Sequence, residues 1–382
     1  MASIKTKPGV LILTPFFSPN IGGTERQLDD LTSALDERGY KVYVQTYSPL
    51  TTQTPWKRFE KRGQHTYITR YHWYGHNLFN KAEKYPLICF LYITPYLFLR
   101  TFLWMIVNHS KTTTIHAQGL NASLIGVVLS RIFRQKLVTS IHAVYEISPT
   151  SIVSKLNYHI LKHSHKILAT SDRSLQELES IGISREKLDV FIPWVNQQLF
   201  RPLSYSLSRK ELGFESTFTV FFLSRLIRKK GARVLVKVAQ LLPEINFVFA
   251  GIGPDAEYIT RQSKLHKNIT FAGTLDYHDI PKYFSASDLY CFPTQYEEGF
   301  GLVLPEALSC GTPIVTSNKG AIPKVVDPTV AILVQPTVAN LKTAILDLYH
   351  HPEKLQYLKS NTVKYAQKRY SSDNVLLISR YY

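Results

Sequence analysis

Short apolar segments that alternate with amphipathic segments restrict the fold of this chain more than any other feature. Residues 10–16 and 41–46 are apolar and strand-like, and residues 22–39 between them carry leucines at helical spacing. The second half repeats the pattern, with strand-like residues 217–224 and 246–250. Strands that alternate with helices form parallel sheets covered by helices, so the sequence predicts an α/β fold.

The chain length predicts more than one domain. At 382 residues the chain exceeds an ordinary single domain, and its 45% hydrophobic content is ample for two cores. Residues 201–216 are mixed and polar and are expected to link two domains, 1–200 and 217–365. Residues 366–382 are expected to form a helix that packs back on the first domain.

The cysteines indicate a reducing compartment. Cys89, Cys291 and Cys310 are far apart in apolar surroundings, without a CxxC pair or a cysteine–histidine cluster. Free thiols of this kind argue against a zinc site and against disulfides. Residues 1–8 are short and polar and do not resemble a secretory signal, so a cytoplasmic location is expected.

The strong positive charge favours anionic partners. The net charge is +17 and the sequence pI is about 9.6. Basic residues are densest at Lys57–Arg62 and continue through Arg70, Lys81 and Lys84. Nucleotides, anionic lipid headgroups or nucleic acid would suit this charge, although a solvated basic surface explains it equally well. No nucleic-acid-binding motif accompanies the charge, so no nucleic acid partner is expected.

The segment Tyr85–Val107 is long and apolar enough to span a membrane, with 23 residues and a single charge at Arg100. Pro86 and Pro95 interrupt it, and Arg100 would lie deep in hydrocarbon. The segment also lies between strands that must share one sheet. We therefore expect a largely buried helix whose aromatic face meets an anionic membrane surface beside the basic stretch, as in a peripheral protein at the inner membrane face.

Two glutamates eight positions apart mark a candidate ligand site. Glu298 follows the apolar, strand-like residues 288–293, and Glu306 begins an expected helix that ends before Gly311. Glycines between them let backbone amides approach a ligand closely, and the start of the helix favours anions. Amides together with two carboxylates suit a ligand that carries phosphate and sugar. Acidic residues that merely stabilise a helix N-terminus are the alternative.

Other polar residues also follow predicted strands, where ligands bind in doubly wound sheets. Arg225 and Lys230 follow the first strand of the second half, and both could hold a diphosphate. Gly253 follows the next strand and would let a base or ribose approach. A solvated basic loop and a simple turn remain the alternatives for these residues. Together they indicate a site in a cleft between two domains.

The first half carries two further candidates. Gly22 and Gly23 begin a helix and suit a phosphate or a sugar diphosphate, or simply form a tight turn. No GxGxxG motif is present, and no acidic residue ends the second strand, so a dinucleotide site is disfavoured. His142 and His116 each end a strand and could face a ligand, although a structural role is the commoner one for a single histidine at a strand end.

The chain resembles the retaining glycosyltransferases of family 4, the group-1 glycosyl transferases with the GT-B fold, over nearly its full length. The motifs that carry the resemblance are Pro15–Pro19 with Gly22–Glu25, His142, Ser224-Arg225 with Lys230-Gly231, Ala250–Pro254, and Glu298–Glu306 with Ala307–Pro313. The resemblance implies two Rossmann-like domains that face each other across a cleft. The first would hold the acceptor and the second the nucleotide-sugar.

The resemblance also implies a role for each site residue. Glu298 would contact the donor sugar and Glu306 the ribose hydroxyls, while Arg225 and Lys230 would hold the diphosphate. His142 would touch the sugar near the reacting carbon. The backbone of Gly22, Gly23, Gly253, Gly299, Phe300, Gly301 and Leu302 would complete the donor site. No cofactor and no metal ion are expected, because arginine and lysine would stabilise the leaving diphosphate.

The expected activity is therefore transfer of a sugar, with retention, from a UDP- or GDP-sugar to a hydroxyl group of a glycan or lipid-linked acceptor. Such a reaction belongs to the biosynthesis of polysaccharides, glycans or glycolipids. A UDP-GlcNAc 2-epimerase-like isomerase is an alternative with a similar architecture, although the acid and base groups that it needs near C2 of the sugar are not identifiable. A non-catalytic protein that binds membrane surfaces is a second alternative.

Overall fold

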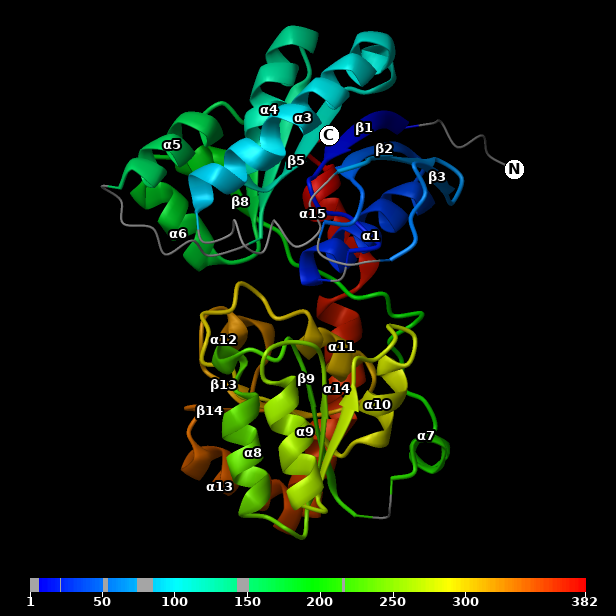
Figure 1. Cartoon of the computed structure of the whole chain (residues 1–382), viewed down its shortest axis with the longest axis vertical. Coiled ribbons are helices and arrows are strands. Elements are labelled where there is room, and N and C mark those ends of the chain that lie inside the picture. The colour runs from blue at the N-terminus through cyan, green and yellow to red at the C-terminus, as the bar shows by residue number, and fades with distance from the viewer. Residues whose placement is uncertain (1–6, 21, 51–53, 74–84, 143–150, 215–216) are drawn as a thin grey trace. The chain divides into compact units, whose positions relative to one another are not determined.

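The computed structural model describes residues 7–20, 22–50, 54–73, 85–142, 151–214 and 217–382. The chain divides into two compact units, one of Met1–Pro193 with Ser372–Tyr382 and one of Trp194–Ser371. Each unit is an α/β domain built on a largely or wholly parallel sheet, as predicted (Figure 1).

The sheet of the first unit has the strand order β3-β4-β2-β1-β5-β6-β7-β8. Every pair in it is parallel except β3 with β4. Its strands are β1 (Lys7–Leu13), β2 (Tyr40–Tyr47), β3 (Phe59–Arg62), β4 (Thr66–Tyr71), β5 (Thr114–Gln118), β6 (Lys136–Ile141), β7 (Lys166–Ala169) and β8 (Leu188–Val190). The central strands are buried on both faces, because helices cover both sides of a parallel sheet.

The helices of the first unit follow the strands as the pattern predicts. They are α1 (Gly23–Glu37), α3 (Pro86–Asn108), α4 (Gly119–Phe133), α5 (Ile152–Leu161), α6 (Asp172–Ser180) and α15 (Leu376–Ser379). Helix α1 begins at the expected glycine and buries Leu28, Leu31 and Leu35 against the sheet. The expected helix 366–382 is interrupted after Arg369, and the residues beyond Ser371 belong to this unit, where Tyr382 Oη lies 2.7 Å from His116 Nδ1.

Helix α3 differs from the expectation of a largely buried helix. Only one face is buried, through Ile93, Leu97 and Met105. In the most hydrophobic 18-residue stretch of the helix, 28% is buried. The aromatic residues pack toward the core, so the exposed face is aliphatic rather than aromatic. By length and composition, α3 is the one helix in the described part of the chain that could cross a membrane.

The sheet of the second unit is wholly parallel, with the order β11-β10-β9-β12-β13-β14. Its strands are β9 (Thr219–Leu223), β10 (Asn246–Ala250), β11 (Ile269–Gly273), β12 (Leu289–Phe292), β13 (Ile314–Ser317) and β14 (Ala331–Val334). Its helices are α7 (Tyr205–Leu212), α8 (Ala232–Gln240), α9 (Ala256–Leu265), α10 (Ile280–Ala286), α11 (Val303–Ser309), α12 (Ile322–Val325), α13 (Val338–His350) and α14 (Pro352–Arg369). Figure 1 shows α8 and α9 side by side in front of this sheet.

The expected linker at residues 201–216 differs from the structure, because the units divide earlier, after Pro193. Residues Tyr205–Leu212 form helix α7 inside the second unit. Arg209 anchors this helix, since its buried guanidinium donates hydrogen bonds to the carbonyl oxygens of Ala286 (3.0 Å) and Thr217 (2.6 Å). Charged side chains made the segment read as solvated, but this arginine is buried with its hydrogen bonds satisfied.

Candidate functional site

The candidate site of the second unit lies where the strand order of its sheet reverses. Strands β9 and β12 are neighbours at the centre, and the chain leaves them toward opposite edges. The loop after β9 carries Arg225 and Lys230, and the loop after β12 carries Glu298. Carboxyl ends of parallel strands lie at one edge of a sheet, so the reversal places these loops side by side.

A buried ion pair joins the two loops. Lys230 donates a hydrogen bond from Nζ to Glu298 Oε1, and the Thr294 hydroxyl donates to the same oxygen at 2.9 Å. Both charged side chains are less than a tenth exposed. Burial lowers the pKa of Lys230 although Glu298 opposes this shift, and the charge of nearby Arg225 lowers the pKa further. A buried pair of this kind requires good geometry to offset desolvation.

The backbone fixes the loops that carry this pair. Lys229 accepts a hydrogen bond through its carbonyl oxygen from the backbone N–H of Gln295 at 2.7 Å. The Thr294 hydroxyl donates a second, longer bond to the same carbonyl at 3.4 Å. Hydrogen bonds to one backbone carbonyl therefore hold the two loops together where the ion pair forms.

Arg225 provides a positive charge beside this junction. Its side chain is exposed, and it forms no ion pair with any described residue. Two cations, Arg225 and Lys230, thus lie beside the carboxylate of Glu298. The local excess of positive charge suits an anion, and the planar guanidinium suits phosphate oxygens in particular.

The segment after β13 holds the backbone of Glu298 from the other side. Ala321 donates its N–H to Glu298 O at 2.8 Å, and Gly320 donates its N–H to Glu297 Oε2 at 2.9 Å. Gly320 has a left-handed φ of +57°, and a Cβ atom there would lie 2.4 Å from both the N and O atoms of Glu298. Only glycine fits at this position. Sequence reasoning missed both residues: the role of Gly320 depends on which loops become neighbours, and that of Thr294 depends on how its own loop folds back.

Glu306 lies one helix further along the chain. Helix α11 begins at Val303, three residues earlier than expected. Glu306 nevertheless lies in the first turn of this helix. The side chain is buried, and its charge adds to the effect of burial in raising the pKa values of Tyr290 and Cys310. Residues 299–302 connect the two glutamates, and the ring of Phe300 packs edge-on against Tyr370 at 5.9 Å between ring centroids.

Gly253 has a packing reason for being glycine. A Cβ atom there would lie 2.5 Å from Leu226 O, because the loops after β9 and β10 run in direct contact. Leu226 donates its N–H to Ile252 O, and Asp255 donates its N–H to Leu226 O. The glycine thus lets one loop support the loop that carries Arg225, and its contact with a donor remains a prediction.

In the first unit, Gln118 is the last residue of β5, and His142 directly follows the adjacent strand β6. His142 is half-buried, and its Nε2 lies 2.7 Å from Gln118 Oε1. Because an amide oxygen only accepts hydrogen bonds, Nε2 of His142 carries the proton and Nδ1 is unprotonated. Nδ1 has no hydrogen-bond partner among the described residues, and burial lowers the pKa of His142 to about 4. Gln118 was missed because it ends a strand without any motif.

The Gly22-Gly23 turn begins helix α1, which follows β1. It therefore lies at the carboxyl ends of the parallel strands of the first sheet, as Gln118 and His142 do. The carboxylate of Glu25 lies against Gly22, with Oε2 2.2 Å from where a Cβ atom would be. A carboxylate at the start of the helix disfavours a phosphate there and is compatible with sugar hydroxyls. Contact of Gly22 and Gly23 with a donor remains a prediction.

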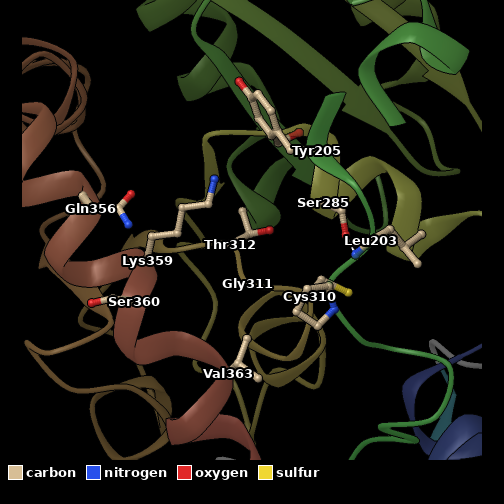
Figure 2. Close-up of a pocket in the computed structure, with 12 residues that line it drawn as sticks. Leu203, Tyr205, Ser285, Cys310, Gly311, Thr312, Gln356, Lys359, Ser360 and Val363 are labelled. Atoms are coloured by element: carbon tan, nitrogen blue, oxygen red, sulfur yellow. Dashed lines mark hydrogen bonds between the residues drawn. The ribbon is translucent and has the colours of Figure 1, made fainter. Parts of the chain in front are cut away.

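No group of three or more histidine, cysteine, aspartate or glutamate side chains that could hold a metal occurs among the described residues. A surface pocket of about 300 Å³ lies away from the ion pair (Figure 2). Ser287 and Thr312 in its wall precede β12 and β13, so it lies at the amino ends of the strands. In doubly wound folds ligands bind at the opposite edge, where Lys230 and Glu298 lie.

Two family models together match most of the chain. Residues 21–198 match the model for glycosyltransferase family 4, and residues 205–365 match that for glycosyl transferases group 1. A human relative, one subunit of phosphatidylinositol N-acetylglucosaminyltransferase, is 23% identical over 344 residues. That alignment covers 87% of this chain and 66% of the human protein, so this chain spans just under two thirds of its relative's length.

Solved structures share the fold. Sucrose-phosphate synthase from Thermosynechococcus elongatus superimposes with a TM-score of 0.81 at 19% identity, covering 98% of each chain. Anabaena HepE in complex with UDP and glucose gives a TM-score of 0.75 at 20% identity, covering 97% of this chain and 98% of that one. With its two family matches, its parallel sheets and its two-glutamate motif, the chain belongs to the group-1 glycosyl transferases of family 4, which have the GT-B fold.

Proposed function

We propose that this glycosyltransferase moves a sugar, with retention of anomeric configuration, from a nucleoside-diphosphate sugar to a hydroxyl acceptor. The observation that carries the proposal is the buried Lys230–Glu298 pair with exposed Arg225 beside it, at the strand reversal of the second sheet. The cations suit a diphosphate that gains negative charge as it leaves, and the carboxylate suits a sugar hydroxyl.

Each group has a distinct role in this proposal. Arg225 binds the diphosphate with its planar fork, and Lys230 turns from Glu298 toward the same phosphates when the donor arrives. Glu298 then accepts a hydrogen bond from the sugar, and Glu306 holds the ribose. His142 stays neutral at physiological pH, because burial keeps its pKa near 4, and therefore contacts the sugar without adding charge.

The departing phosphate takes the proton of the acceptor hydroxyl on the same face of the sugar. Retention through a double displacement would instead need a carboxylate placed as a nucleophile, whereas this proposal uses Glu298 to accept a hydrogen bond from the sugar. No divalent metal takes part in this proposal, so turnover should persist in excess chelator.

A UDP-sugar is the proposed donor. The structure of HepE was determined with UDP and glucose, and the name of the human relative specifies N-acetylglucosamine and phosphatidylinositol. The basic first unit is compatible with an acceptor that carries phosphate or lies at a membrane. The activity places the protein in the synthesis of a glycan or glycolipid.

The donor is best found by a thermal-shift screen of UDP, GDP, ADP and their sugars, because a bound ligand raises the melting temperature. Release of the nucleotide from the best donor is then measured with an acceptor panel. We expect Glu298→Gln and Arg225→Ala each to lower turnover by about a hundredfold or more while the fold stays intact. Arg228→Ala, which removes an exposed arginine from the same loop, is the matched control and should be nearly silent.

Near-normal turnover in both Glu298→Gln and Arg225→Ala would refute the proposed site. The configuration of the new linkage, determined by NMR of the product, tests retention directly. Incubation with UDP-GlcNAc alone distinguishes an isomerase from a transferase, because an isomerase converts the sugar without an acceptor.

A further inference from the structure

The exposed face of helix α3 is aliphatic along the whole helix. Its most exposed apolar residues are spaced by three, four or eight positions, which keeps them on one side of the helix, and are Ile88, Leu91, Leu99, Leu103 and Ile106, with Val107 beside the last. Leu103 is 50% exposed and Val107 is 77% exposed. A soluble helix ordinarily presents charged and polar residues on this side, so the face calls for a partner.

Helix α4 extends this face. It packs against α3, and the rings of Phe102 and Phe133 lie 5.9 Å apart where the two helices end together (Figure 1). Val128 and Ile132 are exposed on α4, one helical turn apart and just before Phe133. The two helices therefore share one apolar surface near their C-terminal ends, here termed the α3–α4 face: Leu103, Ile106, Val107, Val128 and Ile132.

Basic residues border this face. The segments that form α3 and α4 contain no aspartate or glutamate that could neutralise them. Exposed Lys111, Arg131 and Arg134 follow or end the two helices, and Gln135 ties these ends together by donating a hydrogen bond from Nε2 to His109 O at 2.8 Å. Arg131 and Arg134 form no ion pair with a described residue. Residues 85–142 and 151–171 contain no aspartate or glutamate at all, whereas the chain has 28 such residues elsewhere.

The basic stretch first expected to bind anions is less available. Arg62 pairs with Asp29 (2.7 Å) and with Glu60 (2.5 Å), and buried Arg70 also pairs with Glu60 (2.7 Å). Lys81 and Lys84 lie outside the described residues. Lys57, Arg58 and Lys61 remain exposed in that stretch, whereas Lys111, Arg131 and Arg134 are the exposed basic residues at the ends of α3 and α4 themselves.

We propose that the α3–α4 face binds the surface of a membrane that contains anionic lipids. Aliphatic side chains enter the headgroup–acyl boundary, and Lys111, Arg131 and Arg134 contact lipid phosphates. The helix lies on the bilayer and does not cross it. Crossing would remove Ile93, Leu97 and Met105 from the core of the first unit and would break the hydrogen bond from Tyr47 Oη to Ile93 O (2.5 Å).

The test is co-sedimentation of the full chain with phosphatidylcholine vesicles, with and without about 30% phosphatidylserine, at increasing salt. The wild type should bind only the anionic vesicles. Arg131→Gln/Arg134→Gln should weaken binding about thirtyfold, and Leu103→Gln/Ile106→Gln about tenfold. Unchanged melting temperatures would show that these variants remain folded.

The matched controls make equal changes elsewhere. Arg201→Gln/Arg261→Gln removes the same charge, and Leu241→Gln/Leu265→Gln removes comparably exposed leucines; neither should affect binding. Binding that falls equally in controls and test variants would overturn the proposal, as would a wild type that does not bind. Bound protein that resists extraction at alkaline pH would show a spanning helix instead. A dimer dissociated by Leu103→Gln/Ile106→Gln, without vesicle binding, would assign the face to a second copy.

Discussion

The contact between Gly320 and Glu298 allows a direct test of how tightly the site is held. A Cβ atom at position 320 would lie 2.4 Å from the N and O atoms of Glu298, whereas ordinary contacts begin near 3.4 Å. Gly320→Ala therefore has to move the backbone of Glu298 by about 1 Å. Displacements of that size in a catalytic group can cost about a hundredfold in rate.

The same change affects stability through two separate costs. Alanine in the left-handed conformation costs about 1 kcal/mol, and weakening the bond from Ala321 N–H to Glu298 O adds about 1 kcal/mol. We expect Gly320→Ala to lower the unfolding free energy by about 2–3 kcal/mol. Gly213→Ala is the matched control, because Gly213 has a similar φ of +67° and no atom within 4 Å of its Cβ position.

The assay measures turnover with the identified donor and denaturant unfolding for both variants. Gly213→Ala should lose about 1 kcal/mol of stability and keep full turnover. If Gly320→Ala behaves in the same way, then the backbone of Glu298 tolerates displacement and the reasoning fails. If the variant is too unstable to assay at 25 °C, turnover of both variants at a lower temperature, with saturating donor, gives the same comparison.

Two further predictions follow from hydrogen bonds and burial. Thr294→Val removes the hydroxyl that donates to Glu298 at 2.9 Å and should lower turnover about tenfold, whereas Thr294→Ser, which keeps the hydroxyl, should restore most of it; equal activity in both would contradict the role of this bond. Burial lowers the pKa of His116 to about 3 and that of His142 to about 4, so the unfolded state takes up protons first as the pH falls below about 6.5. Between pH 6 and 4.5 each histidine should therefore reduce the unfolding free energy by about 1.4 kcal/mol per pH unit, and the slope should flatten in His116→Gln and His142→Gln; an unchanged slope would show that these histidines are protonated in the folded state.

Local patterns in the sequence were enough to predict the elements that position the site. The apolar runs that became β9 and β12 are buried on both faces, which is why their lengths and the polar residues that follow them could be recognised. The pairing of Lys230 with Glu298 follows from two such strand ends being neighbours. The family resemblance, rather than periodicity, supplied the roles of the individual residues.

The features that sequence reasoning missed depend on how loops fold and on which segments become neighbours. Thr294, Gln118 and Gly320 carry no local signal, because each acts on a residue from another loop or another part of the same loop. The aliphatic exposure of α3 was misjudged because composition does not say which face of a helix is covered. Residues 201–216 were expected to form a linker because they are polar, although Arg209 among them is buried and donates to Ala286 O, a residue far along the chain.

The register between β9 and β12 has a consequence for how the second unit holds together. Only two residue pairs join these strands, Leu289 with Val220 and Tyr290 with Phe221, yet they connect one half of the sheet to the other. Lys230 belongs to one half and Glu298 to the other. A donor that both residues bind would therefore bridge the two halves of the sheet at the strand pair with the fewest paired residues. Substrate binding and cohesion of the domain would then be coupled.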